Sequence, residues 1–317
     1  ARSCLLNRSS SRCRIIRSKS AVRTAVSVGG SPVAKFVSIE EIAPAFKRYV
    51  VEAPEIARKH QAGQFVIVLM GEHAERIPLT IADTDPEAGT ITLVVQEVGK
   101  STMEMGTMKA GDPIQVVGPL GKATHIENFG TCVCIGGGAG IAPMLPIARA
   151  LKEAGNKVVS ILGGRNEGLI ILRPEMIEAS HEMIYTTDDG SFGRKGVVTD
   201  ALKTFIEEEG KPDLVIAIGP AIMMKFVALM TKEYEIPTVV SLNTIMIDGT
   251  GMCGGCRVAV GGDSKFVCVD GPEFDAHEVD FDLMMKRQLI YLEEEEIARK
   301  RYLEQHACRA TDGVEVS

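Results

Sequence analysis

The sequence has no long uninterrupted run of apolar residues. The nearest stretch, Cys132 to Ala148, is broken by four glycines and two prolines. It is typical of a strand, a turn and the beginning of a helix. It is too interrupted to be a membrane-spanning helix, which needs about 20 predominantly apolar residues in a row. Low-complexity tracts are also absent from the body of the chain. With 317 residues, 45% of them hydrophobic and 24% charged, the sequence predicts a globular protein of two or three domains without a transmembrane segment.

The first 31 residues contain neither aspartate nor glutamate, and the first acidic residue of the chain is Glu40. The same segment holds seven basic residues and eight serines. This composition is typical of an organelle-targeting presequence. Because the pattern stops at residues 29–32, we expect a presequence over residues 1–31 that leads to the matrix of a mitochondrion-like organelle. The alternatives are a basic tail that binds an acidic surface and a cytoplasmic location.

Basic residues are scarce in the rest of the chain. Without the first 31 residues, 28 lysines and arginines stand against 42 aspartates and glutamates, so the net charge falls from −7 to −14. Nucleic acids are polyanions that proteins bind mainly through lysine and arginine. A body this acidic therefore argues against nucleic acid as a partner.

Cysteines are few and unevenly placed. Three of the eight are clustered. Cys253 and Cys256 lie in the motif Asp248-Gly-Thr-Gly-Met-Cys253-Gly-Gly-Cys256, and Cys268 follows it. Two thiolates separated by two small residues can wrap one iron, and a third can return from a short hairpin. The glycines let the backbone curl tightly and aim N–H groups at sulfides. The motif therefore predicts a metal or iron–sulfur site.

Zinc is the main competitor, because Cys-x-x-Cys also suits a tetrahedral zinc site. A zinc ribbon normally brings a second Cys-x-x-Cys or a pair of histidines. Neither follows in this sequence, where His277 is the one nearby candidate. A cluster of structural thiols without metal is the remaining alternative.

The residues after position 32 divide into three segments. Residues 33–128 show short apolar or alternating runs, such as Gln64–Leu69 and Thr90–Val95, separated by turn residues. This pattern predicts an antiparallel sheet or small barrel, with one helix near Ser101–Met108. In residues 129–236, buried strand candidates alternate with helices, which predicts a parallel sheet covered by helices.

Five strands and three helices are expected from this alternation. The strands are Thr131–Ile135, Lys157–Leu162, Met183–Thr186, Leu214–Ile218 and Thr238–Ser241, and the helices are one that ends at Ala154, Thr199–Glu209 and Ala221–Glu233. The third segment, residues 237–317, holds the cysteine cluster and a long helix expected near Phe281–His306.

A glycine-rich turn, Gly136-Gly-Gly-Ala-Gly140-Ile-Ala-Pro143, follows the first of these strands. Glycines permit the close approach of a pyrophosphate, and the helix N-terminus supplies N–H donors and positive potential. The turn indicates a nucleotide site, although the same pattern also occurs as an ordinary strand-to-helix connection.

A second phosphate-binding combination lies in the first segment. Arg76-Ile-Pro-Leu-Thr80 supplies a guanidinium and a hydroxyl, and Gly99-Lys-Ser-Thr102 supplies hydroxyls and a helix N-terminus. Taken singly, these are a surface arginine and a helix cap. Taken together, they can hold a diphosphate.

The order of these motifs resembles that of the ferredoxin–NADP reductase superfamily. It continues with Gly-Pro-Leu-Gly at 118–121, Gly-Gly-Arg-Asn at 163–166, Thr-x-Asp-Gly-Ser at 187–191 and Gly-Pro-x-x-Met-Met at 219–224. The cysteine-bearing tail resembles the electron-transfer subunit of dihydroorotate dehydrogenase. More closely, it resembles the small subunit of NADH-dependent reduced-ferredoxin:NADP oxidoreductase, also known as a sulfide dehydrogenase subunit. Asp248 stands where the dihydroorotate branch has a cysteine, and residues 271–282 also fit the closer branch.

The resemblance implies an antiparallel FAD-binding barrel over residues 33–128, a parallel-sheet NAD(P)-binding domain over 129–236 and a small [2Fe–2S] region with a C-terminal helix over 237–317. It implies FAD contacts at Arg76, Pro78, Leu79, Thr80, Gly99, Ser101 and Thr102. It implies nicotinamide nucleotide contacts at Gly137, Gly138, Gly140, Thr187, Asp188, Asp189, Gly190 and Ser191. The implied cluster ligands are Asp248, Cys253, Cys256 and Cys268. Since Cys132, Cys134 and Cys308 match no ligand position, we interpret the first two as buried strand residues.

The implied function is electron transfer between NAD(P)H and a partner protein through FAD and the cluster. In the family, a large flavin- and iron–sulfur-containing subunit is the partner that meets ferredoxin and NADP, so a hetero-oligomer is expected. We expect no catalytic acid or base. We expect NAD(H) rather than NADP(H), because Asp188 and Asp189 lie in the turn expected near the adenosine ribose. NADP(H) is the alternative, since Arg165, Arg194 or Lys195 could reach a 2′-phosphate. The alternatives are a dihydroorotate dehydrogenase electron-transfer subunit and a non-enzymatic iron–sulfur or zinc-binding module.

Overall fold

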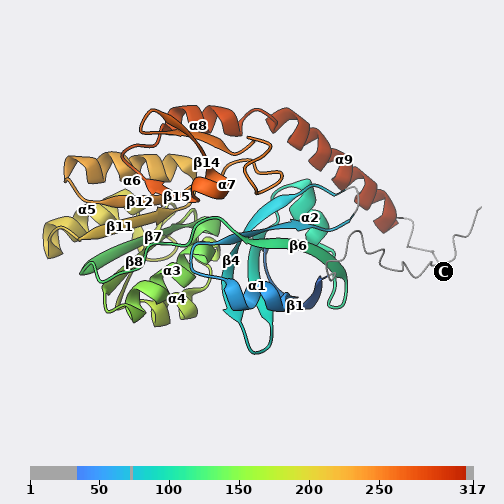
Figure 1. Ribbon diagram of the computed structural model, residues 1–317, viewed down its shortest axis with the longest axis horizontal. Coiled ribbons are helices and arrows are strands. Elements are labelled where there is room, and N and C mark those ends of the chain that lie inside the picture. Colours follow the sequence, from blue (N-terminus) through green and yellow to red (C-terminus); the bar gives the residue numbers. More distant parts are fainter. Residues whose placement is uncertain (1–33, 72–73, 312–317) are drawn as a thin grey trace, which may run out of the picture. The chain divides into compact units, whose positions relative to one another are not determined.

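The computed structural model describes residues 34–71 and 74–311, with side chains to residue 305 (Figure 1). The described residues belong to one compact unit. The presequence expected over residues 1–31 and the side chain of Cys308 lie outside them.

The first segment forms the predicted antiparallel barrel. Its strands pair in the order β1-β2-β5-β4-β3-β6, and β6 pairs with β1 to close it. Along β5, alternate residues point inward, so Ile91, Leu93 and Val95 are buried in the barrel interior. The barrel elements are β1 (Ala34–Ala43), β2 (Phe46–Glu52), α1 (Pro54–Lys59), β3 (Phe65–Leu69), β4 (Ile77–Asp85), β5 (Thr90–Gln96), α2 (Lys100–Gly106) and β6 (Pro113–Leu120).

The second segment forms the predicted parallel sheet, with strand order β10-β9-β8-β7-β11-β12-β15. Only the edge strand β15 runs antiparallel to its neighbour. The strands are β7 (Thr131–Gly137), β8 (Lys157–Gly164), β9 (Glu182–Thr187), β10 (Arg194–Lys195), β11 (Leu214–Ile218), β12 (Thr238–Ser241) and β15 (Glu273–Asp275). The helical elements are η1 (Gly138–Gly140), α3 (Ile141–Glu153), η2 (Glu167–Leu169), α4 (Arg173–Ala179), α5 (Val198–Glu209) and α6 (Ala221–Glu233).

Both faces of this sheet are buried, and β7 shows how. Cys132 and Cys134 point into the core beneath α3 and α4, which confirms them as buried strand residues. Val133 and Ile135 point to the opposite core, beneath α5 and α6. Strands buried on both faces have nearly continuous apolar sequences, which is why β7 and β11 were predicted with bounds close to those observed.

The strand order places the direction change of the sheet between β7 and β11. The chain runs from β7 outward to β8 and β9 and then returns to β11 on the other side. The loops at the carboxyl ends of two such strands diverge and leave a crevice, where open α/β sheets bind ligands.

The barrel packs against the helix layer of α3 and α4. Phe46 of β2 and Ala82 of β4 are buried in the same apolar core as α3. An ion pair joins Arg149 of α3 to Asp83 of β4, with Nη1 and Oδ1 2.8 Å apart. Because both partners of the ion pair are exposed, it contributes at most about 1 kcal/mol, and apolar burial holds the two layers together.

The third segment begins after β12. The cysteine-bearing loop leads to a hairpin of β13 (Arg257–Val260) and β14 (Asp263–Phe266), then to α7 (Val267–Asp270) and back to the sheet edge at β15. The hairpin expected between Cys256 and Cys268 is therefore present.

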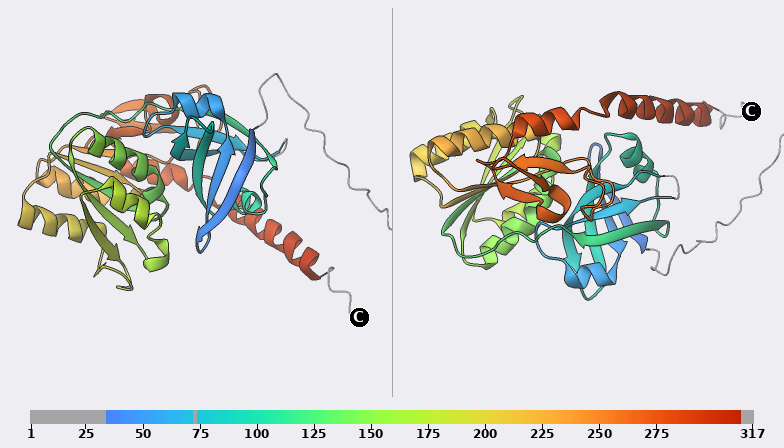
Figure 2. Two further views of the ribbon diagram at one scale, coloured as in Figure 1. Left: turned by 90° about the horizontal axis from the view of Figure 1, so that it is seen from below. Right: turned by 45° about the horizontal axis from the view of Figure 1, so that its top comes forward.

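The single long helix expected over Phe281–His306 is wrong. Two helices are present, α8 (Phe281–Gln288) and α9 (Leu292–Thr311), separated by a turn. Phe281 and Met284 bury α8 in the core beside α6, whereas α9 leaves that core and runs past the barrel (Figure 2). The turn contains neither glycine nor proline, so the break follows from tertiary packing and not from a local breaker.

Among the helices in residues 34–71 and 74–311, none combines the length and the apolar character needed to cross a membrane.

Candidate cofactor and iron–sulfur site

A cavity of about 1120 Å³ lies between the barrel and the carboxyl ends of the central strands. Barrel strands β3, β4 and β5, the glycine-rich turn after β7 and the loop after β11 all contribute to its wall. The cavity therefore occupies the crevice that the strand order creates. The predicted site residues that line it are Pro78, Thr80, Gly137, Gly138, Gly140 and Asp188.

Three glycines bring the backbone of the turn after β7 to the cavity wall. A Cβ at Gly140 would lie 2.2 Å from the carbonyl oxygen of Ile218, and one at Gly137 would lie 2.5 Å from Sδ of Met223. Gly138 has a φ of +54°, and a Cβ there would meet nothing within 4 Å. A side chain at this position would thus project into open space beside the cavity.

Two hydroxyls at the cavity wall support a polar ligand. Thr186 Oγ1 and Thr244 Oγ1 are buried and have no hydrogen-bond partner among the described residues. Both residues line the cavity. Since a buried hydroxyl without a partner costs about 1–3 kcal/mol, these atoms fit a ligand that carries hydrogen-bonding groups, as a dinucleotide does.

The predicted residues of β4 separate into two sets. Pro78 and Thr80 line the cavity, whereas Leu79 packs against the barrel core. This is the alternation of a strand, whose successive side chains point to opposite faces. Arg76, which precedes the strand, is exposed and does not line the cavity.

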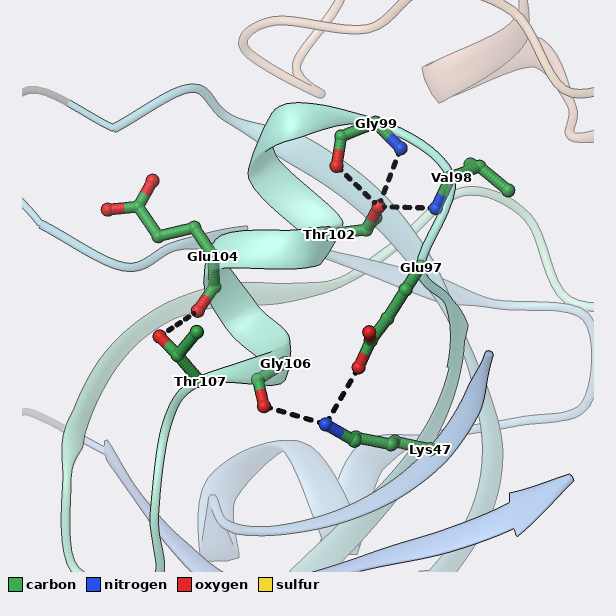
Figure 3. A network of polar contacts seen from close by, with 8 residues as sticks. All are labelled: Lys47, Glu97, Val98, Gly99, Thr102, Glu104, Gly106 and Thr107. Atoms are coloured by element: carbon green, nitrogen blue, oxygen red, sulfur yellow. Dashed lines mark hydrogen bonds and ion pairs between the residues drawn. The ribbon is translucent and has the colours of Figure 1, made fainter. Parts of the chain in front are cut away.

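The predicted residues at the start of α2 serve the helix itself. Thr102 Oγ1 accepts hydrogen bonds from the N–H groups of Val98 and Gly99, both at 3.0 Å, and donates to the carbonyl oxygen of Gly99 (Figure 3). Ser101 Oγ donates to the carboxylate of Glu75. Gly99, Ser101 and Thr102 do not line the cavity, but Val98, directly before them, does.

The other end of α2 is tied to the barrel. Lys47 Nζ of β2 donates to the carbonyl oxygen of Gly106 at 2.7 Å and pairs with Glu97 at 2.8 Å (Figure 3). These contacts fix the helix on the barrel wall and place its N-terminal turn beside Val98.

The turn after β9 uses most of its polar groups internally. Asp189 Oδ1 accepts from the N–H of Ser191 at 2.9 Å, and the side-chain and backbone hydrogen bonds from Ser191 lower the pKa of the Asp189 carboxyl. Ser191 Oγ accepts from the N–H of Glu167, and Gly190 has a φ of +79°. Asp188 is the member of this turn that lines the cavity, together with Arg165 from the turn after β8.

Several cavity residues carry no sequence motif. Thr186 precedes the Thr-x-Asp-Gly-Ser motif, and Thr244 precedes the cysteine motif, so proximity to a motif was the one available signal for them. Phe226 lies on the exposed side of α6 and is recognisable only from the packing of the helix against the cavity.

The structure brings Cys256 and Cys268 together. Their sulfur atoms are 3.2 Å apart, and both side chains are buried. Cys256 precedes the β13–β14 hairpin and Cys268 follows it in α7, so the hairpin determines their separation. Burial raises the pKa of the Cys268 thiol to about 12, and bound iron would offset this because it takes the thiolate as its ligand.

Asp248 and Cys253 form the other half of the loop. Asp248 Oδ1 accepts from the N–H of Thr250 at 2.8 Å, and its Oδ2 accepts from the N–H of Cys253 at 2.7 Å. The first of these bonds is the main cause of a lowered pKa of the Asp248 carboxyl, which is therefore an anion at neutral pH. The Cys253 side chain is exposed.

Within residues 34–71 and 74–305, no three His, Cys, Asp or Glu side chains lie close enough together to hold one metal ion. The four predicted ligands instead occupy one loop as two pairs, Asp248 with Cys253 and Cys256 with Cys268. A two-iron cluster takes two protein ligands at each iron, so this arrangement fits it better than it fits a single tetrahedral zinc ion.

Two family models match the chain. The oxidoreductase NAD-binding domain matches residues 134–229, and the iron–sulfur cluster binding domain of dihydroorotate dehydrogenase B matches residues 243–280. The first range contains the glycine-rich turn and the second contains the two ligand pairs.

Similar proteins cover most of the chain. A homologue of the dihydroorotate dehydrogenase B (NAD⁺) electron-transfer subunit in Thermotoga maritima is 48% identical over 277 residues, 87% of this chain and 98% of the relative. An electron-transfer subunit of Streptococcus pneumoniae dihydroorotate dehydrogenase B is 33% identical over 248 residues, 76% of this chain and 97% of the relative.

The fold has a close counterpart among solved structures. A structure of the NADH-dependent reduced ferredoxin–NADP oxidoreductase, described for flavin-based electron bifurcation, matches with a TM-score of 0.81 and 47% identity, over 87% of this chain and 100% of that chain. By its sequence, its two domain matches and its fold, the chain belongs to the family of dihydroorotate dehydrogenase B electron-transfer subunits and their homologues, with a ferredoxin–NADP reductase-like fold.

Proposed function

We propose that the chain passes electrons between NAD(H) and a partner subunit by way of FAD and a [2Fe–2S] cluster. One observation carries the proposal. The segment from Ser241 to Met246 lines the cavity, and Asp248 follows two residues later. The first proposed cluster ligand therefore lies within two residues of the cavity wall. This supports the proposal, because electron transfer requires the two redox groups to lie close together.

The protein supplies position and not acid–base chemistry. When bound, FAD exchanges a hydride with the nicotinamide, and the cluster carries single electrons. On the barrel side, Pro78 and Thr80 would hold the flavin, and Arg76 and the start of α2 would contact its phosphates. On the sheet side, the backbone of Gly137–Gly140 would hold the dinucleotide close to the N-terminus of α3.

The two ligand pairs would hold the cluster. Asp248 and Cys253 would bind one iron, and Cys256 and Cys268 the other. Gly249 and Gly251 have positive φ and let the chain turn between Asp248 and Cys253, and Gly254, also with positive φ, lies between the two pairs.

We propose a large flavin- and iron–sulfur-containing subunit as the partner, in a hetero-oligomer that reaches ferredoxin through that subunit. The 47% identity to a ferredoxin–NADP oxidoreductase structure supports this choice. A dihydroorotate dehydrogenase is the second candidate partner, because the relatives from Thermotoga and Streptococcus carry its name. Reconstitution of the chain with each candidate partner in turn distinguishes them. The true partner should accept electrons from NADH through this chain, and the other should not.

For location, we propose that residues 1–31 direct the chain to a mitochondrion-like matrix, on their composition alone. A fusion of these residues to a fluorescent reporter that remained in the cytoplasm would favour the alternative location.

The absorption spectrum of the purified protein tests the proposed function. We expect flavin bands together with the broad envelope of a [2Fe–2S] cluster, and bleaching of both when NADH is added. A colourless protein that contains zinc would show that the chain is a metal-binding module and would overturn the proposal.

Asp248 is expected to be an iron ligand. The variant Asp248→Ala should reduce iron from about two atoms per chain while FAD remains bound, because it removes an anionic ligand. Asp248→Cys should keep a cluster whose reduction potential and EPR g-values differ, since oxygen is a harder ligand than sulfur. Iron analysis, EPR and redox titration measure these changes.

The hydrogen bonds of Asp248 to Thr250 and Cys253 supply the competing explanation, a residue that only shapes the turn. Asp248→Asn separates the two, because asparagine keeps an oxygen acceptor for the turn but loses the charge. Asp263→Ala, an exposed carboxylate in the hairpin, is the matched control. A full cluster with unchanged EPR in Asp248→Ala would refute the ligand assignment.

NAD(H) should be preferred to NADP(H). Asp188 lines the cavity and can accept from a ribose 2′-hydroxyl, whereas its charge repels a 2′-phosphate. Asp188→Asn should raise the ratio of kcat/KM for NADPH to that for NADH by roughly tenfold, the effect of one hydrogen bond to a charged group. Ferricyanide reduction measures both values.

Asp189→Asn is the control for this prediction, because that carboxylate is bound to the Ser191 N–H and does not line the cavity. It should leave the ratio close to that of the unchanged protein. A native preference for NADPH, through Arg165 at the cavity wall, would contradict the prediction.

A further inference from the structure

The segment Gly271–Asp282 follows the last proposed cluster ligand and has no part in the proposed function. Much of it is a strap on α6, where His277 Nε2 and Thr231 Oγ1 are 3.0 Å apart. Glu273 differs from the rest of the strap. Its carboxyl contacts the connection between the barrel and the parallel sheet.

This contact joins three parts of the chain. Thr124 Oγ1 donates to Glu273 Oε1 at 2.5 Å, and Thr124 lies in residues 121–130, which link β6 to β7. The N–H of Lys122 donates to the carbonyl oxygen of Gly271 at 2.7 Å, and the N–H of Thr124 donates to that of Ala62 at 2.9 Å. The connection is thus held by the strap on one side and by the barrel on the other.

The contact is closely packed where it faces the barrel, although Glu273 itself is only partly buried. A Cβ at Gly63 would lie 2.3 Å from Thr124 Oγ1 and 2.9 Å from Glu273 Oε1. The packing continues to the cofactor cavity, because a Cβ at Gly121 would lie 2.8 Å from the Phe65 ring and 3.0 Å from Pro272 Cδ. Phe65 and Pro272 both line the cavity. Movement at Glu273 would therefore be transmitted to the cavity wall.

The carboxyl has no cationic partner among the described residues, and Thr124 is its one hydrogen-bond donor there. Burial raises its pKa from 4.5 to about 7, and this effect exceeds the opposing one of the Thr124 hydrogen bond, which favours the ionised carboxylate. Neither barrel residues 61–64 nor β12 carries a titratable side chain. The connection carries Lys122, His125 and Glu127, all exposed, and β7 carries the buried Cys134, whose pKa the Glu273 charge helps to raise.

We propose that Glu273 is a positioning residue. While protonated, its carboxyl clamps the β6–β7 connection and the Phe65–Pro272 wall of the cofactor cavity, and its ionisation loosens both. The role of that wall rests on the proposed function, but the clamp itself is a property of the protein and can be measured without turnover.

The direction of the pH effect follows from linkage. The pKa of the carboxyl is higher in the clamped state than its ordinary value, so the clamp is fully stabilising below pH 4.5 and loses that stabilisation as the pH rises through about 7. Between these values, the equilibrium for opening should rise by up to about tenfold per pH unit, and it should level off above them.

Hydrogen exchange of the Lys122 and Thr124 amides tests the clamp in the full-length protein. After correction for intrinsic exchange, protection of these amides should fall with pH over this window relative to the Val215 amide, which donates to the carbonyl oxygen of Pro237. In Glu273→Gln, which accepts from Thr124 but cannot ionise, protection should be independent of pH. Glu278→Gln, at an exposed position of the same strap, should behave as the unchanged protein.

The dissociation constant of FAD, followed by flavin fluorescence, supplies a second measurement. It should rise with pH over the same window in the unchanged protein and stay flat in Glu273→Gln. If Glu273→Gln does not fold, Thr124→Val tests the proposal instead. This variant removes the hydroxyl that donates to Glu273, so the β6–β7 connection should be loosened already at low pH.

An identical pH dependence in Glu273→Gln and the unchanged protein would overturn the proposal, as would full protection of the Lys122 amide in Thr124→Val. The proposed function fails separately, by the absence of a flavin and iron–sulfur spectrum.

Discussion

Close backbone contact between two loops at the centre of the parallel sheet is the constraint on which the site depends. The turn after β7 and the loop after β11 approach so closely that Gly140 leaves no room for a Cβ beside the Ile218 carbonyl group. A Cβ at Gly219 would likewise lie 3.1 Å from Cα of Gly137. Because Gly137, Gly140 and Gly219 leave little room for a Cβ, the backbone of both loops reaches the cavity wall. A helix N-terminus at such a place can offer N–H donors to a bound phosphate.

The barrel forms the part of the cavity wall that faces the parallel sheet. Its strand β4 presents Pro78 and Thr80 to the same cavity, while its alternate residues support the barrel interior. Packing of the barrel against α3 therefore determines the distance between a flavin on one wall and a dinucleotide on the other. The loop that carries Cys253 and Cys256 follows β12, so it is attached to the same sheet.

The sequence predicts those parts of the fold whose signals are local. The alternation in β5 and the continuous apolar runs of β7 and β11 identify strands without tertiary information. Strands β10 and β15 have two and three residues, and they exist only because β9 and β12 offer edges for pairing. The break between α8 and α9 has the same kind of cause, since only α8 finds a core to enter.

The site shows a similar division. Spacing indicated the glycine turn and the cysteine cluster, whereas Asp248 was added as a ligand by the family resemblance. Spacing gave no reason to separate Thr80 from Leu79, or Asp188 from Asp189, whose side chains the structure directs to different places. The pairing of Cys256 with Cys268 also depends on a folded hairpin. The hydroxyl of Thr102 has a further role that spacing did not indicate, because it accepts hydrogen bonds from the N–H groups of Val98 and Gly99.

Both borders of the parallel sheet end in very short strands, β10 at one side and β15 at the other. An open border presents unpaired N–H and carbonyl groups to any other chain that can add a strand. On the β12 side, the border is covered by β15, which is three residues long and belongs to the segment that also carries the proposed iron ligands. One piece of polypeptide thus carries both the proposed iron ligands and the strand that covers this border of the sheet.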